Sequence, residues 1–145
     1  MQEHQDISLL SGYQTPAKAR YFIEYTGKNI DELREATKFA HENTLPILTI
    51  SGGKNLLLAF DEYPGLVIHN NSHGYSLEKN ILTTASGHPI WQLAEELEEK
   101  HGITLWHRFQ GLPGSIGGAV FGNAGCFGLE IGPYVTSVEI LNTET

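Results

Sequence analysis

GLPGSIGGAVFGNAGCFG, residues 111–128, has a glycine at nearly every third position and no charged side chain. Large apolar residues such as Ile116 and Phe127 lie among these glycines, which is not typical of a flexible linker. A collagen-like repeat is excluded because the glycine period breaks between Gly117 and Gly122. The stretch therefore predicts an ordered loop with a short helical turn, whose bare main chain packs closely against a large flat ligand.

The composition indicates a soluble globular protein. The chain has 145 residues, of which 40% are hydrophobic, so it can form a core. The N-terminal MQEHQDISLL lacks the pattern of a signal peptide, and a single cysteine excludes an internal disulfide framework, so we expect a cytoplasmic protein. The net charge of -8 argues against nucleic-acid binding. The uncharged run 109–129 contains Pro113 and many glycines, so no transmembrane helix is expected.

The first half of the chain predicts a strand–helix–strand unit. RYFIEY at residues 20–25 alternates and is rich in aromatic and β-branched residues, as strands are. A helix follows, with Asn29 as its N-cap and its end near Asn43. PILTI at 46–50 then predicts a short buried strand, and the crossover between the two strands should be right-handed.

The pattern then becomes rich in strands. LLLAF at 56–60 and LVIH at 66–69 predict two strands connected by a DEYPG turn. A helix is predicted from Pro89, at the first helical position, to a cap at Gly102. YVTSVEIL at 134–141 predicts a last strand. The whole arrangement belongs to the α+β class.

A second glycine-rich segment, SGGKN at residues 51–55, directly follows the strand PILTI. Glycines at a strand end allow consecutive backbone N–H groups to converge on a phosphate, although a simple turn has the same sequence pattern. The segment is not a Walker loop, because the earlier glycine is missing and Lys54 is followed by Asn55 instead of Ser or Thr.

Taken together, SGGKNLLL (51–58) and GLPGSIGGAVFGNAGCFGLEI (111–131) resemble the UDP-N-acetylenolpyruvoylglucosamine reductase family, within the vanillyl-alcohol-oxidase-type FAD-binding superfamily. The corresponding family segments usually read GGGSNLL, GIPGSIGGA and NAGAYG. The earlier GYQTPAKARYF, which contains Thr15, is also similar to the N-terminal segment of the family. The resemblance covers the whole chain and corresponds to the front half of the family enzyme.

The resemblance implies a PCMH-type FAD-binding domain of the α+β class, with FAD between two subdomains. A small βαβ-containing subdomain would cover residues 1–73. A mainly antiparallel α+β subdomain, incomplete at its C-terminus, would cover 74–145, and the substrate-binding domain would be absent. The residues that match the loop around the FAD pyrophosphate are Gly52, Gly53, Lys54, Asn55 and Leu56. Those that match the segment along the flavin and its ribityl chain are Pro113, Gly114, Ser115, Gly118, Asn123, Ala124, Gly125 and Gly128.

The sequence departs from the family pattern at two places. Lys54 replaces a serine, so an ammonium group either takes the place of a hydroxyl at the phosphate or points into solvent. Cys126 and Phe127 replace Ala and Tyr, which removes a phenolic hydroxyl. Cys126 is interpreted as a packing residue, because no second cysteine is present to form a disulfide with it.

The family chemistry is a hydride relay in which NADPH reduces FAD, and the reduced flavin then reduces the enolpyruvyl group of a UDP-sugar for peptidoglycan synthesis. The serine, glutamate and arginine that the family uses all lie downstream of the segment resembling YVTSVEIL, so no catalytic residue is assigned, and Arg108 is not given that role. No metal site is predicted either. The histidines without metal-ligand spacing, interpreted as surface or turn residues, are His69, His73, His88, His101 and His107.

Three functional hypotheses remain from the sequence. The first is the FAD-binding portion of this reductase, inactive by itself. The second is a non-catalytic fragment that binds a nucleotide or a partner, with self-association through the exposed edge of the strand at 134–141. The third, a phosphate-binding hydrolase that uses Lys54, has little support because no nucleophile with an adjacent base is recognisable.

Overall fold

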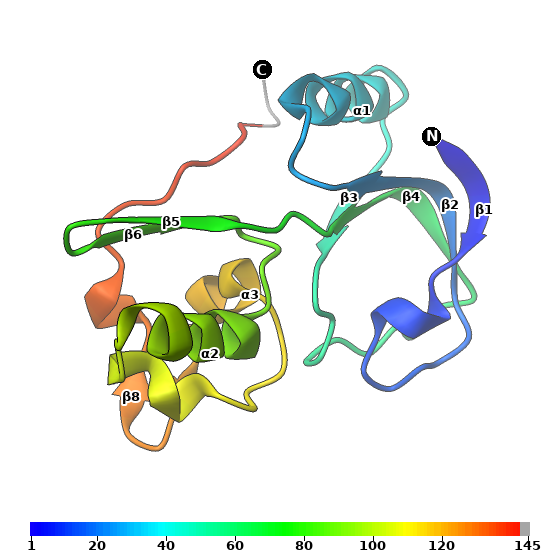
Figure 1. The fold of residues 1–145 in the computed structure, drawn as a ribbon. Helices are drawn as coiled ribbons and strands as arrows, with labels where there is room; N and C mark the ends of the chain where they lie inside the picture. Colours follow the sequence, from blue (N-terminus) through cyan, green and yellow to red (C-terminus); the bar gives the residue numbers. More distant parts are fainter. Residues whose placement is uncertain (143–145) are drawn as a thin grey trace. The chain divides into compact units, whose positions relative to one another are not determined.

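The structure, a computed structural model, describes residues 1–142, which form two compact units. The first unit comprises Met1–Ser72 together with the stretch that starts at Ile140, and the second comprises His73–Glu139. Helices and strands occur in both units (Figure 1), so the predicted α+β class is confirmed. The assignment of 1–73 and 74–145 to the two parts of an FAD site stays a prediction.

A four-stranded sheet organises the first unit. Its strands, in spatial order, are β1 (Gln2–Asp6), β2 (Lys18–Tyr25), β4 (Glu62–Asn70) and β3 (Ile47–Ile50). The last three are parallel, whereas β1 is an antiparallel edge strand that the sequence did not predict. The strands predicted at 20–25 and 46–50 are confirmed. The carboxyl ends of the parallel strands lie at one edge of the sheet, which is where open sheets of this kind bind ligands.

Both faces of this sheet are covered. Helix α1 (Ile30–Glu42) lies across one face, and the loop with the short 3-10 helix η1 (Ser8–Leu10) lies on the other (Figure 1). The Asn29 carboxamide accepts a hydrogen bond from the Asp31 N–H at 3.0 Å, which confirms the predicted N-cap. The helix-side core contains Leu33, Ala36, Ala40, Leu66 and Ile68. The opposite core contains Ile7, Ala17, Ala19, Phe22, Ile50, Leu58 and Val67.

The predicted DEYPG turn is wrong, because most of it lies inside β4. Pairing with β2 shifts between Ala19 and Tyr21, so that Pro64 and Gly65 together face one residue of β2. A bulge of this kind tolerates proline, since an unpaired position needs no N–H donor. The turn residues therefore bend a long strand and do not separate two short ones.

The predicted strand LLLAF is also wrong, because residues 56–60 form a loop. Leu58 is buried with 2% exposure. The backbone carbonyls of this loop accept hydrogen bonds from side chains and not from a neighbouring strand. The Ser11 hydroxyl donates to the Leu56 carbonyl at 2.5 Å, and the Thr15 hydroxyl donates to the Leu58 carbonyl at 2.8 Å. A buried apolar run need not be a strand when side chains supply its hydrogen bonds.

The second unit contains a hairpin, two helices and a short ribbon. Its elements are β5 (Tyr75–Glu78), β6 (Ile81–Thr84), α2 (Ile90–His101), the 3-10 helix η2 (Leu105–Phe109), α3 (Ile116–Phe121), β7 (Gly125–Cys126), β8 (Leu129–Glu130) and the 3-10 helix η3 (Gly132–Tyr134). Both strand pairs are antiparallel. Buried residues of α2, η2 and α3 form one core with Leu129 and Ile131. The glycine-rich stretch thus forms the predicted ordered loop and short helical turn.

The ends of α2 agree in part with the prediction. Gly102 is the C-cap, with a left-handed φ of 66°, as predicted. Pro89 is the N-cap with an extended backbone, and it is not the first helical residue. None of the helices in residues 1–142 has the length and apolar character needed to cross a bilayer.

The predicted strand at 134–141 is wrong. Tyr134 ends the 3-10 helix η3, and residues 135–141 belong to no strand within the described part of the chain. An alternating sequence forms a strand only where a partner strand accepts its hydrogen bonds, and no such pairing is present among residues 1–142. The exposed strand edge that was predicted for self-association is therefore missing from the described structure.

Candidate functional site

The loop 51–55 leaves β3 at the carboxyl edge of the sheet and is held in place by its own hydrogen bonds. The Ser51 hydroxyl donates to the Asn70 carbonyl at 2.8 Å. The Gly53 carbonyl accepts from the N–H groups of Gly12 and Leu56, at 3.0 and 3.2 Å. The loop is therefore anchored to two other segments of the first unit.

The main chain of this loop has unused donors. Among residues 1–142, the N–H groups of Gly52, Gly53, Lys54 and Asn55 have no hydrogen-bond acceptor. The Lys54 side chain is exposed and makes no ion pair in the same part of the chain. Consecutive free N–H groups beside a lysine form a concentration of positive charge that suits a phosphate. Leu56 differs, because its carbonyl is bonded to Ser11 and its side chain packs against the core.

The segment that begins at Pro113 enters α3 through two specialised residues. Gly114 has φ +127°, which favours glycine, and a Cβ built there would meet no atom within 4 Å. The Ser115 hydroxyl, buried at the start of α3, accepts a hydrogen bond from the Gly118 N–H at 3.3 Å. Ser115 is therefore an N-cap. The main chain on either side of it is also bonded, because the Gly114 carbonyl accepts from the Ile90 N–H at 3.1 Å and the Gly118 carbonyl accepts from the Gly122 N–H at 3.0 Å. Of these two glycines, Gly114 is half-buried and Gly118 is exposed.

Asn123 connects the loop after α3 to the following ribbon. Its side-chain amide donates to a Glu130 carboxylate oxygen at 3.1 Å, and its carbonyl oxygen accepts from the Gly132 N–H at 3.0 Å. The Ala124 N–H donates to Ala119 at 2.7 Å. The amide of Asn123 thus fixes the loop internally, although the residue itself is exposed.

The ribbon β7–β8 turns through Phe127 and Gly128, which have φ values of 48° and 79°. Two consecutive positive φ values in a two-residue connection are the pattern of a type I′ turn. Phe127 is 82% exposed, and the turn borders a pocket of about 500 Å³. The residues that line this pocket are Gly125, Cys126, Phe127, Gly128, Leu129, Glu130, Pro133 and Tyr134. Two of the predicted cofactor residues, Gly125 and Gly128, therefore line one pocket.

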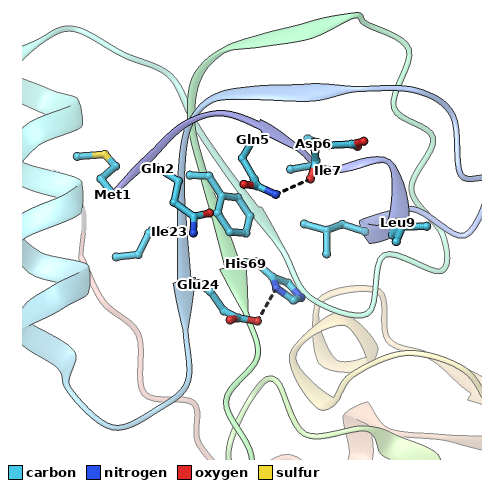
Figure 2. Close-up of a pocket in the computed structure, with 11 residues that line it drawn as sticks. Met1, Gln2, Gln5, Asp6, Ile7, Leu9, Ile23, Glu24 and His69 are labelled. Carbon is cyan, nitrogen blue, oxygen red and sulfur yellow. Dashed lines mark hydrogen bonds and ion pairs between the residues drawn. The ribbon is translucent and has the colours of Figure 1, made fainter.

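A larger pocket, of about 690 Å³, lies in the first unit between β1, η1 and the strands β2 and β4. None of the predicted cofactor residues lines it, and the carboxylate side chains in its lining are those of Asp6 and Glu24, which do not favour a phosphate. Figure 2 shows Glu24 and His69 pointing toward one another, with 3.3 Å between the carboxylate oxygen and the imidazole Nδ1. Burial lowers the pKa of His69, and the Glu24 carboxylate opposes that shift. Sequence reasoning missed this pocket because it did not predict β1.

His88 is buried, with 4% exposure, so it is not a surface residue. It does end a turn, in which its N–H donates to the Ala85 carbonyl at 3.1 Å, as the interpretation as a surface or turn residue allowed. Its Nδ1 accepts from the Gly74 N–H at 3.2 Å, and its Nε2 has no hydrogen-bond partner among the residues described. Burial lowers the pKa of His88, while Glu96 acts in the opposite direction. Within residues 1–142, no group of three His, Cys, Asp or Glu side chains could hold a metal ion.

These features, a glycine loop with free donors after a parallel strand and a second bare segment beside a pocket, are typical of a protein that binds a dinucleotide cofactor. A family model described as FAD binding domain matches residues 25–144, and the chain belongs to this family. This family match confirms the predicted cofactor, FAD.

The relatives that the chain resembles are UDP-N-acetylenolpyruvoylglucosamine reductases. The protein from Gloeobacter violaceus is 34% identical over 148 residues, which cover 100% of this chain and 48% of the relative. That from Chlamydia muridarum is 32% identical over 143 residues, covering 98% of this chain and 47% of the relative. The protein from Pseudomonas putida is 31% identical over 153 residues, which cover 99% of this chain and 43% of the relative. The chain therefore spans about half the length of the relatives it matches, and the predicted family resemblance is confirmed.

Proposed function

We propose that this chain is the FAD-binding portion of a UDP-N-acetylenolpyruvoylglucosamine reductase of peptidoglycan precursor synthesis. The observation that carries the proposal is the row of unbonded N–H groups at Gly52, Gly53, Lys54 and Asn55, at the carboxyl end of a parallel strand. Main-chain donors and a lysine bind a pyrophosphate even in a chain whose net charge is -8, because they act locally.

In this proposal the loop holds the pyrophosphate and the second segment holds the flavin and its ribityl chain. The bare main chain of Gly114, Gly118, Gly125 and Gly128 permits close approach of a flat ring, and Asn123 with Ala124 fixes the shape of that segment. Ser115 supports it by capping α3. Bound FAD would supply the hydride-transfer chemistry, with NADPH as the reductant and a UDP-sugar as the substrate.

The isolated chain should bind FAD without turning over substrate. The family resemblance implies that the serine, glutamate and arginine used in the reaction belong to a later part of the enzyme. The activity of the complete enzyme would take place in the cytoplasm, as the sequence predicted.

The test is a titration of the purified chain with FAD, followed by the change in flavin fluorescence. We expect saturable binding that ADP displaces, because ADP shares the pyrophosphate with FAD. Lys54→Ala should weaken FAD binding roughly tenfold, the effect of one lost charge-assisted contact. Lys28→Ala, at another exposed lysine of the first unit, is the matched control and should bind like the parent chain. We also expect no consumption of NADPH with the UDP-enolpyruvyl sugar. Absence of FAD binding, or turnover by the chain alone, would contradict the proposal.

A further inference from the structure

The pocket of about 690 Å³ in the first unit combines apolar and polar side chains. Ile7 and Phe22, which are buried, belong to its apolar lining. Leu9 of η1 also lines the pocket and is 83% exposed, so a large apolar side chain there is not covered by the rest of the described chain. Sites for small molecules have volumes of this order and the same combination of apolar lining with a few polar groups.

Two carboxylates of the lining keep one oxygen each for a ligand. Glu24 Oε1 accepts from the Asn71 side-chain amide at 3.0 Å, and it lies 3.3 Å from the His69 Nδ1 (Figure 2). Asp6 Oδ1 accepts from the N–H and the hydroxyl of Ser8, at 2.8 and 2.6 Å. The second oxygen of each carboxylate has no hydrogen-bond donor in the described part of the chain.

The contact with Glu24 determines which nitrogen of His69 is available to a ligand. A carboxylate only accepts, so we assign the ring hydrogen to Nδ1, beside the Glu24 carboxylate. Burial lowers the pKa of His69, and Glu24 opposes that shift, so the imidazole is neutral at neutral pH. Its Nε2 is then an acceptor, and it has no partner among the residues described. Two carboxylates and one imidazole thus provide acceptors at this pocket.

The charge of the pocket lining is negative. Neither Asp6 nor Glu24 forms an ion pair with lysine or arginine in the part of the chain described. Hydrogen bonds from Ser8 lower the pKa of Asp6, and Lys18 contributes least to that shift. The Met1 ammonium also borders the pocket and pairs with neither carboxylate, so two carboxylates and one ammonium leave the lining negative. Such a lining suits a hydrogen-bond donor that carries positive charge.

We propose that this pocket is a binding site for a small organic cation, a protonated amine on an apolar body. The ammonium would donate to the Glu24 carboxylate and to the His69 Nε2, and the apolar body would pack against Leu9 and Phe22. None of the predicted cofactor residues lines the pocket, so this site goes beyond the proposed function and does not depend on it.

The experiment titrates the purified chain with 2-phenylethylamine, which is protonated at neutral pH, and follows binding by isothermal titration calorimetry. Two comparison ligands keep the phenyl ring and change the charge: 2-phenylethanol is neutral and 3-phenylpropanoate is an anion. We expect saturable binding of the amine to one site. The alcohol and the acid should bind at least about tenfold more weakly, because neither brings a charge-assisted donor.

Variants then locate the site. Glu24→Gln removes the charge and keeps an acceptor for the Asn71 amide, and it should weaken amine binding about tenfold. Glu35→Gln makes the same change of charge on α1, where Glu35 is exposed and forms no ion pair in the described chain, so it is the matched control and should bind like the parent. Asp6→Asn is the second variant, used if circular dichroism shows that Glu24→Gln does not fold. The NMR signals of the His69 ring should shift during the amine titration.

The inference is overturned if the parent chain does not bind the amine, if the alcohol or the acid binds as tightly, or if the folded Glu24→Gln variant keeps the parent affinity. Saturating FAD should leave the affinity for the amine unchanged, and displacement of the amine by FAD also overturns a separate site. Failure of the parent chain to bind FAD contradicts the proposed function only. Failure to bind the amine overturns this inference alone.

Discussion

Gly53 is the residue at which the geometry of the loop 51–55 depends most on the absence of a side chain. Its φ is +58°, and a Cβ built there would lie 1.7 Å from the Leu10 carbonyl oxygen. The sequence pattern of two glycines after a strand predicted a close approach to a phosphate. The structure shows that Gly53 is required for a further reason, since a backbone segment far away in the sequence occupies the space of its side chain.

Gly53→Ala should destabilise the first unit by more than about 3 kcal/mol, because strain at a left-handed φ adds to a clash with backbone that cannot move freely. Gly102→Ala is the matched control, since Gly102 has φ +66° and no atom within 4 Å of a built Cβ. Gly102→Ala should lower the free energy of unfolding by only about 1 kcal/mol, because it introduces backbone strain at a left-handed φ without a clash. Urea unfolding of both variants measures the difference, and equal losses would contradict the steric argument.

The ribbon β7–β8 is the element in which stability and proposed function conflict. A type I′ turn favours Asn or Gly at its first central position, where this chain has an exposed phenylalanine with φ 48°. Phe127 contributes little to the core, so the strained conformation is not compensated by burial there. Such a residue is consistent with a role in contacting a ligand.

Phe127→Asn should therefore raise the stability of the second unit by about 0.5–1 kcal/mol, because asparagine adopts the left-handed conformation at lower cost. The same variant should bind FAD more weakly, since it removes an aromatic side chain from the pocket. Phe127→Leu controls for the loss of the ring, and it should weaken FAD binding without any gain in stability. Thermal unfolding and flavin titration check the two effects, and a Phe127→Asn variant less stable than the parent chain would rule out the argument.

At the scale of the whole molecule, each unit contains a histidine whose pKa is lowered by burial, half-buried in the first unit and fully buried in the second. His69 lies in the first unit beside Glu24, and His88 lies in the second near Glu96, with His73 and Lys100 also contributing. Both imidazoles have an ordinary pKa of 6.5 in the unfolded chain and a lower pKa in the folded chain. As the pH falls below 6.5, the unfolded chain takes up more protons than the folded chain, so stability is lost on acidification.

The free energy of unfolding should accordingly be constant at neutral pH and decrease as the pH falls through the window just below 6.5. His88→Asn should flatten this decrease for the second unit, because asparagine offers an acceptor to the Gly74 N–H and does not titrate. Urea titrations across this pH range provide the measurement. Stability that rises on acidification, or a His88→Asn profile with the parent slope, would be inconsistent with histidines whose pKa is lowered by burial.

Local patterns in the sequence were sufficient for several elements. The strands at 20–25 and 46–50, the helix capped by Asn29 and the cap at Gly102 depend on interactions within a few residues, so their signals are present in the sequence. The two glycine-rich segments indicated bare backbone against a flat or phosphorylated ligand, and their resemblance to the reductase family implied that this ligand is FAD.

Only the tertiary structure decided which segments found strand partners and which side chains became buried. The strands predicted at 56–60 and 134–141 do not form, because strand formation depends on a partner that local alternation cannot specify. Three further features depend on positions that are distant in the sequence. They are the burial of His88, the backbone clash that requires Gly53 and the contact of Arg108 with Phe127. The sequence by itself thus determined the cofactor family, while the folded chain decided the contacts, because these depend on long-range packing.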